Sequence, residues 1–299
     1  MRPIIGFIGV GAMGSGMCSN LLKAEYQVNV FDANKALAEK MCEKGAILKD
    51  SAKAIGETSD IVVTVLPNGK IVNSVLFDED GLADGMHSGQ ILLECSTVYV
   101  KEALELAKRL EEKGIVMLDC PVSGGPEGSE AGTLSIMVGG DESTYKQCLP
   151  IFEAMGKEIV YTGKNGNGQL TKLINQLLYD INTAALCEVL TFAVKLGLDP
   201  EKTGRIVNTG SGRSNASKYF LDDILNRNFK HGYAMESAYK DLINASLLSN
   251  DSQIPMPILG AATAIYQSAL CMGYGNGSKA SMIKVYEALN NVQFKAADK

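Results

Sequence analysis

Strand-like and helix-like segments alternate through the first 160 or so residues of the chain, and then the strand-like segments stop. The strand-like segments are apolar runs separated by helical stretches such as KALAEKMCEKG and KEALELAKRLEEKG; they read IIGFIGV, QVNVFD, IVVTVL, QILLEC, GIVMLDC and LSIMVGG. Strands that alternate with helices in this way form a parallel sheet with crossover helices. We therefore predict an α/β fold for this half, with a doubly wound parallel sheet.

Helical patterns take over after the last strand-like segment, EIVYTG at 158–163. They cover 168–196, about 200–208, 217–226, 235–249, 256–272 and 279–291. The three glycines and two asparagines of GKNGNG, at 163–168, mark a turn before the first of these helices. With 299 residues the chain is long enough for two cores. We expect an α/β first domain at 1–163 and an all-helical second domain at 164–299, joined by a long helix that starts near 168.

Charge, hydropathy and cysteine usage exclude several classes of protein. The net charge is −6 and no cluster of lysine or arginine stands out, which argues against a nucleic-acid partner. No apolar run approaches the roughly 20 residues of a membrane span. The seven cysteines are scattered, with no CxxC pair, which favours reduced thiols in the cytoplasm over disulfides or a zinc site. The start, MRPIIGFIGVGAMG, contains several glycines and no clear cleavage site, so we interpret it as a strand and not a secretion signal.

A glycine-rich turn follows the first predicted strand. Gly9, Gly11 and Gly14 form GxGxxG, with Ala12 and Met13 inside it, between a strand and a helix at about 13–24. Such glycines allow a tight turn and close approach of the backbone to a pyrophosphate at the helix N-terminus. We predict a Rossmann-type cofactor site here. The alternative is a glycine-rich turn without a ligand.

Asp32 ends the second predicted strand, 18 residues after Gly14. An acid at this place accepts hydrogen bonds from the adenosine ribose and repels a 2′-phosphate, so it favours NAD over NADP. Lys35 lies nearby and partly offsets that repulsion, which leaves NADP open. The alternative is that Asp32 only caps the following helix.

One lysine looks out of place in GQLTKLINQLLY, residues 168–179. Apolar residues at helical spacing, from Leu170 through Ile174 and Leu178 to Ile181, predict a buried face. Lys172, Asn175, Gln176 and Tyr179 share another face, and the 20 residues from Gly168 to Cys187 contain only two charges, Lys172 and Asp180. The polar face is either solvated or it carries a working lysine.

A second glycine-rich stretch, DCPVSGGPEGSEAGTLSIMVGG, follows the fifth predicted strand. Its first part lies at the carboxyl end of a strand, where doubly wound folds bind ligands. Ser123 supplies a hydroxyl, and Gly124 and Gly125 leave backbone N–H groups open to a carboxylate. A plain glycine-rich turn is the alternative.

Taken together, these motifs resemble those of the β-hydroxyacid dehydrogenase family, also called the 3-hydroxyisobutyrate dehydrogenase-like family. Its members include tartronate semialdehyde reductase and 2-(hydroxymethyl)glutarate dehydrogenase. The resemblance covers nearly the whole chain, through FIGVGAMGSGM, VLPNG, ECSTV, DCPVSGGPEGSEAGTLSIMVGG, GNGQLTKLINQ and YKDLINA. It implies that Lys172 donates and accepts the proton, that Ser123 and Gly124 hold the substrate carboxylate, and that Asn175 orients the substrate. It further implies a group on the cofactor side, which comprises Leu66, Pro67, Asn68, Thr97 and Lys240. A homodimer or homotetramer follows by analogy.

The implied reaction is reversible hydride transfer between a nicotinamide cofactor and a small 3-hydroxy acid or its semialdehyde. Histidine is the usual proton carrier, but the chain has only His87 and His231, and neither lies in these motifs. Burial between the domains is expected to lower the pKa of Lys172 from about 10.4 toward roughly 7 to 8.

Three alternatives to this reaction stay open. A 6-phosphogluconate dehydrogenase carries histidine-asparagine after the lysine, where this chain has KLINQ, and an imine reductase usually replaces the lysine. A non-catalytic dinucleotide-binding module is expected to lose catalytic residues, yet Ser123, Lys172 and Asn175 are present. Two departures from the family are the Asn175-Gln176 pair, where many members have two asparagines, and GYGNGSKASMIKVYE, which lacks a common acid.

Arg213 lies in TGSGRSNASKYF, a polar loop between two predicted helices. It is either a solvated arginine next to a helix cap at Ser214 or Asn215, or a ligand for a second substrate carboxylate. The second interpretation rests on a similar serine-glycine-arginine-serine stretch in 2-(hydroxymethyl)glutarate dehydrogenase, whose substrate is a dicarboxylate.

Overall fold

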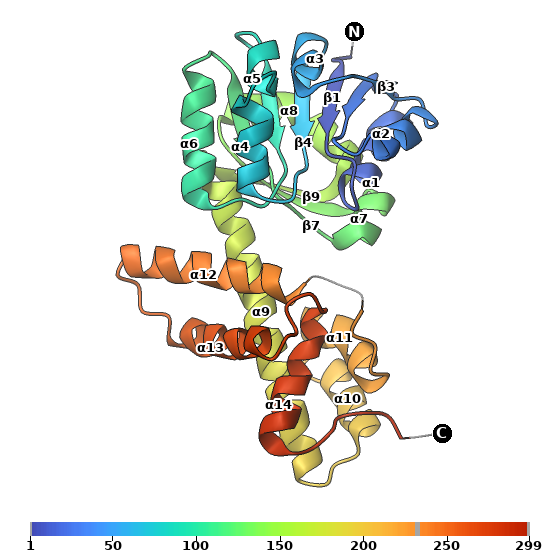
Figure 1. Cartoon of the computed structure of the whole chain (residues 1–299), viewed down its shortest axis with the longest axis vertical. Coiled ribbons are helices and arrows are strands. Elements are labelled where there is room, and N and C mark those ends of the chain that lie inside the picture. Colours follow the sequence, from blue (N-terminus) through green and yellow to red (C-terminus); the bar gives the residue numbers. More distant parts are fainter. Residues whose placement is uncertain (1, 231–233, 298–299) are drawn as a thin grey trace. The chain divides into compact units, whose positions relative to one another are not determined.

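The computed structural model describes residues 2–230 and 234–297 and divides into two compact units, 1–172 and 173–299. His231 lies outside the described residues. The strands are β1 (Ile5–Ile8), β2 (Val28–Phe31), β3 (Ile47–Leu48), β4 (Ile61–Thr64), β5 (Ile91–Glu94), β6 (Val116–Asp119), β7 (Val122–Ser123), β8 (Leu134–Gly139) and β9 (Gly156–Gly163). The helices of the first unit are α1 (Gly14–Lys23), α2 (Lys35–Cys42), α3 (Ala52–Glu57), α4 (Gly69–Phe77), α5 (Leu82–Gly85), α6 (Val100–Glu111), α7 (Gly125–Ala131) and α8 (Glu142–Met155) (Figure 1).

The first unit is a doubly wound sheet with the strand order β3-β2-β1-β4-β5-β6-β8-β7, and β9 pairs with β8. Strands β1 to β6 are parallel to one another, whereas β8 is antiparallel to β6 and β7. The sequence patterns predicted a parallel sheet that included LSIMVGG, but this strand, β8, is antiparallel to β6 and β7. The two-residue strands β3 and β7 were not predicted. The α/β fold with a doubly wound sheet is confirmed.

Alternate residues of the central strands enter separate cores on the two faces of the sheet. Phe7 and Val63 pack into one core with α1, α2 and α8, while Ile8 and Val62 pack into the other with α3 to α6. This two-sided burial explains why the strands read as continuous apolar runs in the sequence. The loops that follow the parallel strands therefore start from the same edge of the sheet, and helices packed on both faces hold this sheet in place.

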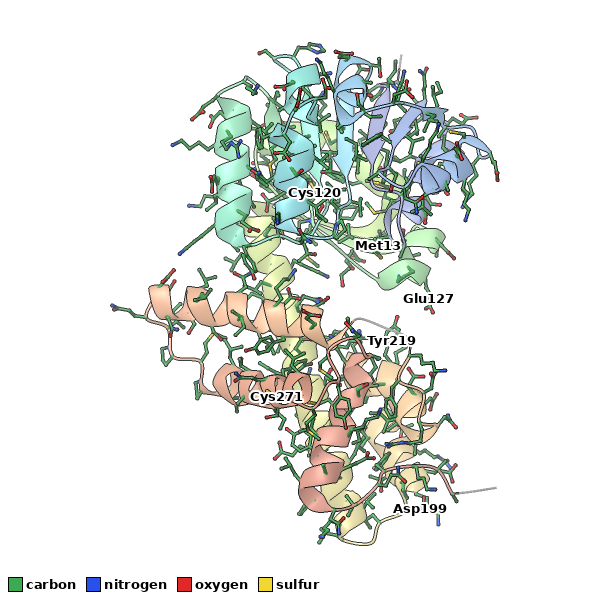
Figure 2. All side chains as sticks on the ribbon, in the orientation of Figure 1. Met13, Cys120, Glu127, Asp199, Tyr219 and Cys271 are labelled. Carbon is green, nitrogen blue, oxygen red and sulfur yellow. The ribbon has the colours of Figure 1, made fainter. Side chains whose placement is uncertain are left out.

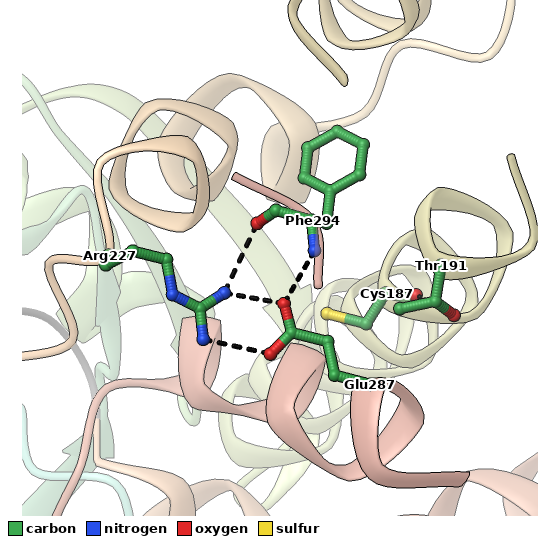
Figure 3. A network of polar contacts seen from close by, with 5 residues as sticks. All are labelled: Cys187, Thr191, Arg227, Glu287 and Phe294. Carbon is green, nitrogen blue, oxygen red and sulfur yellow. Dashed lines mark hydrogen bonds and ion pairs between the residues drawn. The ribbon is translucent and has the colours of Figure 1, made fainter. Parts of the chain in front are cut away.

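Within residues 173–230 and 234–297, the second unit is helical apart from one isolated β-bridge between Ala234 and Ser278. It contains most of α9 (Asn167–Lys195), then α10 (Pro200–Thr209), α11 (Asn215–Leu225), α12 (Met235–Asp251), α13 (Pro257–Cys271), the 3₁₀ helix η1 (Lys279–Met282) and α14 (Ile283–Asn290). Asp199 caps α10 by accepting from Lys202 N at 2.9 Å, and Ser214 caps α11. A polar network fixes the C-terminal segment to this unit: Arg227 binds both carboxylate oxygens of Glu287, which also accepts from Phe294 N at 2.9 Å (Figure 3).

Helix α9 is only partly buried, and this corrects one prediction. Leu170, Ile174 and Leu178, predicted to lie on a buried face, are exposed. Two of them, Ile174 and Leu178, begin an apolar line that runs along α9 to the residue just after its end. We call the following residues the α9 stripe: Ile174, Leu178, Val189, Phe192 and Leu196, each more than half exposed. The helix is also long and apolar enough to span a membrane by length and composition, but core helices of soluble proteins meet those two criteria equally. Periodicity located an apolar face but did not show what covers it.

Candidate functional site

The glycine loop after β1 contains glycines that are required for different reasons. A Cβ on Gly9, whose φ is +92°, would collide with the Val65 carbonyl oxygen, and one on Gly14 would collide with the Gly9 carbonyl oxygen. A Cβ on Gly11 would meet no protein atom within 4 Å. The packing of this unit therefore explains Gly9 and Gly14, and the open space at Gly11 fits close approach of a dinucleotide pyrophosphate. Ala12 and Met13 complete the turn into α1, and Figure 2 labels Met13 at this point.

Asp32 lies directly after β2 and is already bonded to the glycine loop. One carboxylate oxygen accepts from Val10 N at 2.8 Å, and the other accepts from Asn34 N at 2.8 Å. Each oxygen of an ionised carboxylate has a further lone pair, so these bonds leave acceptor capacity for ribose hydroxyls. Asp32 thus holds the loop and the start of α2 and can still bind a ribose.

The ends of β4 and β5 bring the predicted nicotinamide-side residues near the same edge of the sheet. Ile8 is the register partner of Thr64, and Thr64 is that of Glu94, so the loops after β1, β4 and β5 start side by side. Leu66 N donates to Ser96 Oγ at 2.8 Å, which links the loop containing Pro67 to the one containing Thr97. Asn68 caps α4 by accepting from Ile71 N at 3.0 Å.

Two buried carboxylates at this edge were missed by the sequence analysis. Glu94 and Asp119 are fully buried register partners at the ends of β5 and β6. Glu94 accepts from Thr64 Oγ1 at 2.5 Å and from Ser96 N at 2.7 Å, and burial raises its pKa to about 7. An acid closing an otherwise apolar strand, as in ILLE and VMLD, was the available signal.

Asp119 fixes the start of α9, the helix that carries Lys172. Its two oxygens accept from Gly166 N at 2.8 Å and Gln169 N at 2.9 Å. The Gln169 side chain in turn donates to Ser96 O at 2.8 Å and accepts from Val98 N at 3.1 Å. Burial raises the pKa of Asp119, while the two N–H donors act in the opposite direction. The first turn of α9 is thus bonded to the edge from which the cofactor-type loops leave.

The Ser123 segment lies beside the antiparallel part of the sheet. Ser123 ends β7 and pairs with Ser135 of β8. Gly124 and Gly125 have φ values of +141° and +67°, which L side chains rarely adopt, and both are exposed. Ser129 Oγ of α7 donates to Met13 O, which brings this segment next to the start of α1. In Figure 2, α7 can be found by its labelled residue Glu127. The glycines are therefore required by the backbone, and they also leave N–H groups accessible.

Helix α9 carries Lys172, Asn175 and Gln176 on one face. Lys172 is 8% exposed and Gln176 is buried, whereas Asn175 is exposed and donates to Gln176 Oε1 at 3.3 Å. Lys172 is the last residue of the first unit, and Asn175 belongs to the second. A buried lysine on a helix is uncommon unless it has a partner or a task.

Two further predicted residues lie in the second unit. Arg213 is exposed in the loop between α10 and α11, directly before the capping residue Ser214. Lys240, on α12, is half-buried, with its Nζ 3.8 Å from Asp241 Oδ1. Among the described residues of the second unit, the contacts of these two side chains do not indicate whether either one binds a ligand.

Comparison with protein-family models gives two matches that together cover most of the chain. Residues 4–163 match the model described as the NAD binding domain of 6-phosphogluconate dehydrogenase. Residues 166–286 match the model described as NAD-binding of NADP-dependent 3-hydroxyisobutyrate dehydrogenase. The helical half thus resembles 3-hydroxyisobutyrate dehydrogenase.

Curated relatives and solved structures agree with these matches. The chain is 37% identical over 289 residues to 2-(hydroxymethyl)glutarate dehydrogenase of Eubacterium barkeri, with 96% of each chain covered. It is 31% identical to 2-hydroxy-3-oxopropionate reductase of Escherichia coli, covering 96% of this chain and 98% of the relative. The structure of Mycobacterium tuberculosis 3-hydroxyisobutyrate dehydrogenase with L-serine superposes with a TM-score of 0.85 at 29% identity, covering 95% of this chain and 99% of that chain. The chain therefore belongs to the 3-hydroxyisobutyrate dehydrogenase-like family of β-hydroxyacid dehydrogenases, and it is a nicotinamide-dependent oxidoreductase.

Proposed function

We propose that this enzyme interconverts a small 3-hydroxy acid and its semialdehyde, with Lys172 as the proton carrier. The observation that carries the proposal is the buried position of Lys172 on a helix whose first turn is bonded, through Asp119 and Gln169, to the sheet edge of the glycine loop. Nicotinamide, when bound, supplies the hydride acceptor or donor. The remaining work falls to the protein: to orient the hydroxyl-bearing carbon and to move one proton.

Each remaining step is assigned to a named group. Ser123 Oγ and the N–H groups of Gly124 and Gly125 bind the substrate carboxylate, because they are accessible donors on a rigid turn. Asn175 orients the substrate hydroxyl. Lys172 Nζ removes the hydroxyl proton during oxidation and returns it during reduction. The loop containing Leu66, Pro67, Asn68 and Thr97, together with Lys240, serves the cofactor.

Steady-state turnover against a panel of 3-hydroxy acids and semialdehydes, with NAD and NADP separately, tests this assignment. We expect cofactor reduction with at least one small 3-hydroxy acid and cofactor oxidation with its semialdehyde. Binding of NAD without turnover of any member of the panel would favour a non-catalytic dinucleotide-binding module.

Asp32 is proposed to set a preference for NAD. Replacing Asp32 with alanine removes a ribose acceptor and a negative charge, and should shift the ratio of kcat/KM for NADP over NAD upward by roughly tenfold. The variant also loses the acceptor for Val10 N, so both cofactors will bind more weakly and the ratio is the informative measurement. Lys35→Ala is the matched control and should move the ratio in the opposite direction. An unchanged ratio in Asp32→Ala means that the carboxylate serves only the loop.

Arg213 is proposed to bind the far carboxylate of a dicarboxylic substrate. Support comes from the exposed guanidinium in a loop fixed by the Ser214 cap, and from the name of the relative that acts on 2-(hydroxymethyl)glutarate. Arg213→Ala should reduce kcat/KM for a dicarboxylate by roughly tenfold to a hundredfold, because a bidentate charged contact is lost, and should spare a monocarboxylate of similar length. Lys218→Ala, another exposed cation of the same segment, is the control. Equal losses on both substrates would overturn the assignment.

We also propose that the protein is a cytoplasmic homo-oligomer, a dimer or tetramer. The α9 stripe supports this, because large exposed apolar side chains in one line are a common feature of protein interfaces. A line of apolar side chains along one helix can pair with the same line of a second copy about a twofold axis, which makes a second copy the natural partner. The free state of all seven cysteines supports a reducing compartment.

A further inference from the structure

A fully buried ion pair lies inside the second unit, away from its surface. Lys279 Nζ of η1 is 2.6 Å from Asp180 Oδ1 of α9, and both side chains are 0% exposed. Burial lowers the pKa of Lys279, and the charges of Asp180 and then Asp241 oppose that shift. Taking two charges out of water costs free energy that their attraction often fails to recover, so an apolar pair is frequently as stable. A pair of this kind defines a geometry better than it stabilises a fold.

The geometry that this pair defines is that of the Tyr179 ring. Lys279 Nζ lies 3.5 Å from the centroid of this ring, in a cation–π contact. The same ring stacks on Phe220 of α11, with centroids 5.6 Å apart and planes at 16°. Tyr266 OH of α13 donates to Asp180 O at 3.3 Å and ties the neighbouring backbone. The Tyr179 ring is therefore fixed by two contacts, the stacking on Phe220 of α11 and the cation–π contact with Lys279 of η1.

Tyr179 occupies the polar face of α9 that the proposed function uses. It follows Asn175 by four residues and Lys172 by seven, which places it on the same face about 10 Å along the helix from the lysine. Its stacking partner belongs to α11, whose capped start follows Arg213 directly. The Tyr179 ring thus stacks on the helix that follows the Arg213 loop and belongs to the same face of α9 as Asn175, all within one compact unit.

We propose that Lys279 is a positioning residue for substrate selectivity: held by Asp180, it fixes the Tyr179 ring as the wall that limits the length of the 3-hydroxy acid beyond Asn175. This inference rests on the proposed function of the α9 polar face. Substrates short enough to end before the ring are accepted, and longer 3-hydroxy acids are rejected because the ring has no freedom to move aside.

The test compares two double variants. Lys279→Met alone leaves the Asp180 carboxylate buried without its ammonium group and is prone to misfolding, so Lys279→Met/Asp180→Leu removes both charges together. The matched control is Arg227→Met/Glu287→Leu, which removes another ion pair of the same unit, at 2.6 Å, whose carboxylate also accepts from Phe294 N near the C-terminus (Figure 3). Far-UV circular dichroism and thermal melting compare folding and stability across the three proteins.

The readout is the ratio of kcat/KM for a short over a longer 3-hydroxy acid that differs by one or two methylene groups. In Lys279→Met/Asp180→Leu this ratio should fall by roughly tenfold, because one methylene group in a pocket contributes at least that much discrimination. The fall should come from a change in KM and not in kcat. Tyr179→Ala should produce the same fall, and the control should leave the ratio unchanged. An unchanged ratio in the Lys279 double variant, or an equal fall in the control, would overturn the proposal.

Binding separates this inference from the proposed reaction. Calorimetric titration of the same two acids into the NADH-loaded protein, whose cofactor cannot accept a hydride, gives their Kd ratio without turnover. If the unchanged protein shows no turnover but the Lys279 double variant changes the Kd ratio of the two acids, the positioning role is supported and the proposed reaction is contradicted. If the unchanged protein is active and the Kd ratio is the same in the Lys279 double variant, only the positioning role is contradicted.

Discussion

Replacing Lys172 with alanine should lower turnover by roughly 10²- to 10⁴-fold, the range typical of general acid-base catalysis. The reason is that the other groups on the polar face of α9 are poor proton carriers near neutral pH: Asn175 and Gln176 are amides, and burial raises the pKa of the Tyr179 phenol further. The fold and NAD binding should be retained, because the first turn of α9 is fixed by Asp119 and Gln169. Single-turnover kinetics together with NAD affinity measure the two effects separately.

Lys195→Ala is the matched control for this prediction. It removes a lysine from the last turn of the same helix, where Nζ donates to Asn290 O at 2.9 Å. Its turnover should stay near that of the unchanged protein. If Lys172→Ala also retains turnover within a few-fold, the buried lysine has a structural role only and the proton carrier lies elsewhere.

A glutamate at Phe192 should convert the proposed oligomer into smaller species. Phe192 is 60% exposed in the centre of the outer half of the α9 stripe. Burying a large apolar side chain contributes about 1.5 to 3 kcal/mol, and a twofold interface contains each substitution twice. The expected loss of roughly 3 to 6 kcal/mol corresponds to a dissociation constant raised by about 10² to 10⁴. Sedimentation or light scattering over a range of protein concentrations measures it.

Leu289→Glu provides the comparison for Phe192→Glu. Leu289 of α14 is also apolar and highly exposed, but it is not part of the stripe. Its substitution should leave the molecular mass unchanged. A monomeric unchanged protein at high concentration, or equal dissociation by both variants, would contradict the assignment of the stripe as the interface.

The sequence predicted those features that depend on local periodicity. The apolar strands from IIGFIGV to LSIMVGG, and the helices after residue 163, agree with the structure within a few residues. The strands are short continuous apolar runs, and the helices have a 3.6-residue apolar pattern. The two-residue strands β3 and β7 were missed because strands so short have no measurable pattern. Their pairing depends on neighbours distant in sequence.

Burial and polar networks were less predictable than the elements themselves. Ile174 and Leu178 were assigned to a buried face, since periodicity shows that a helix has an apolar side but not which surface meets it. Asp119 gave no local signal of its partnership with Gly166 and Gln169, which lie 47 and 50 residues away. The pairing of Asp180 with Lys279 spans 99 residues and equally depends on the tertiary fold.

The bonds of Asp119 also determine when the first unit finishes folding during synthesis. A nascent chain that has emerged as far as residue 163 already contains every strand from β1 to β9. It still leaves the buried Asp119 carboxylate without the N–H groups of Gly166 and Gln169, and a buried carboxylate without donors is strongly unfavourable. We therefore expect the sheet to reach its full stability only when the ribosome releases the first turn of α9. A fragment ending at 172 should be a markedly better independent folding unit than one ending at 163.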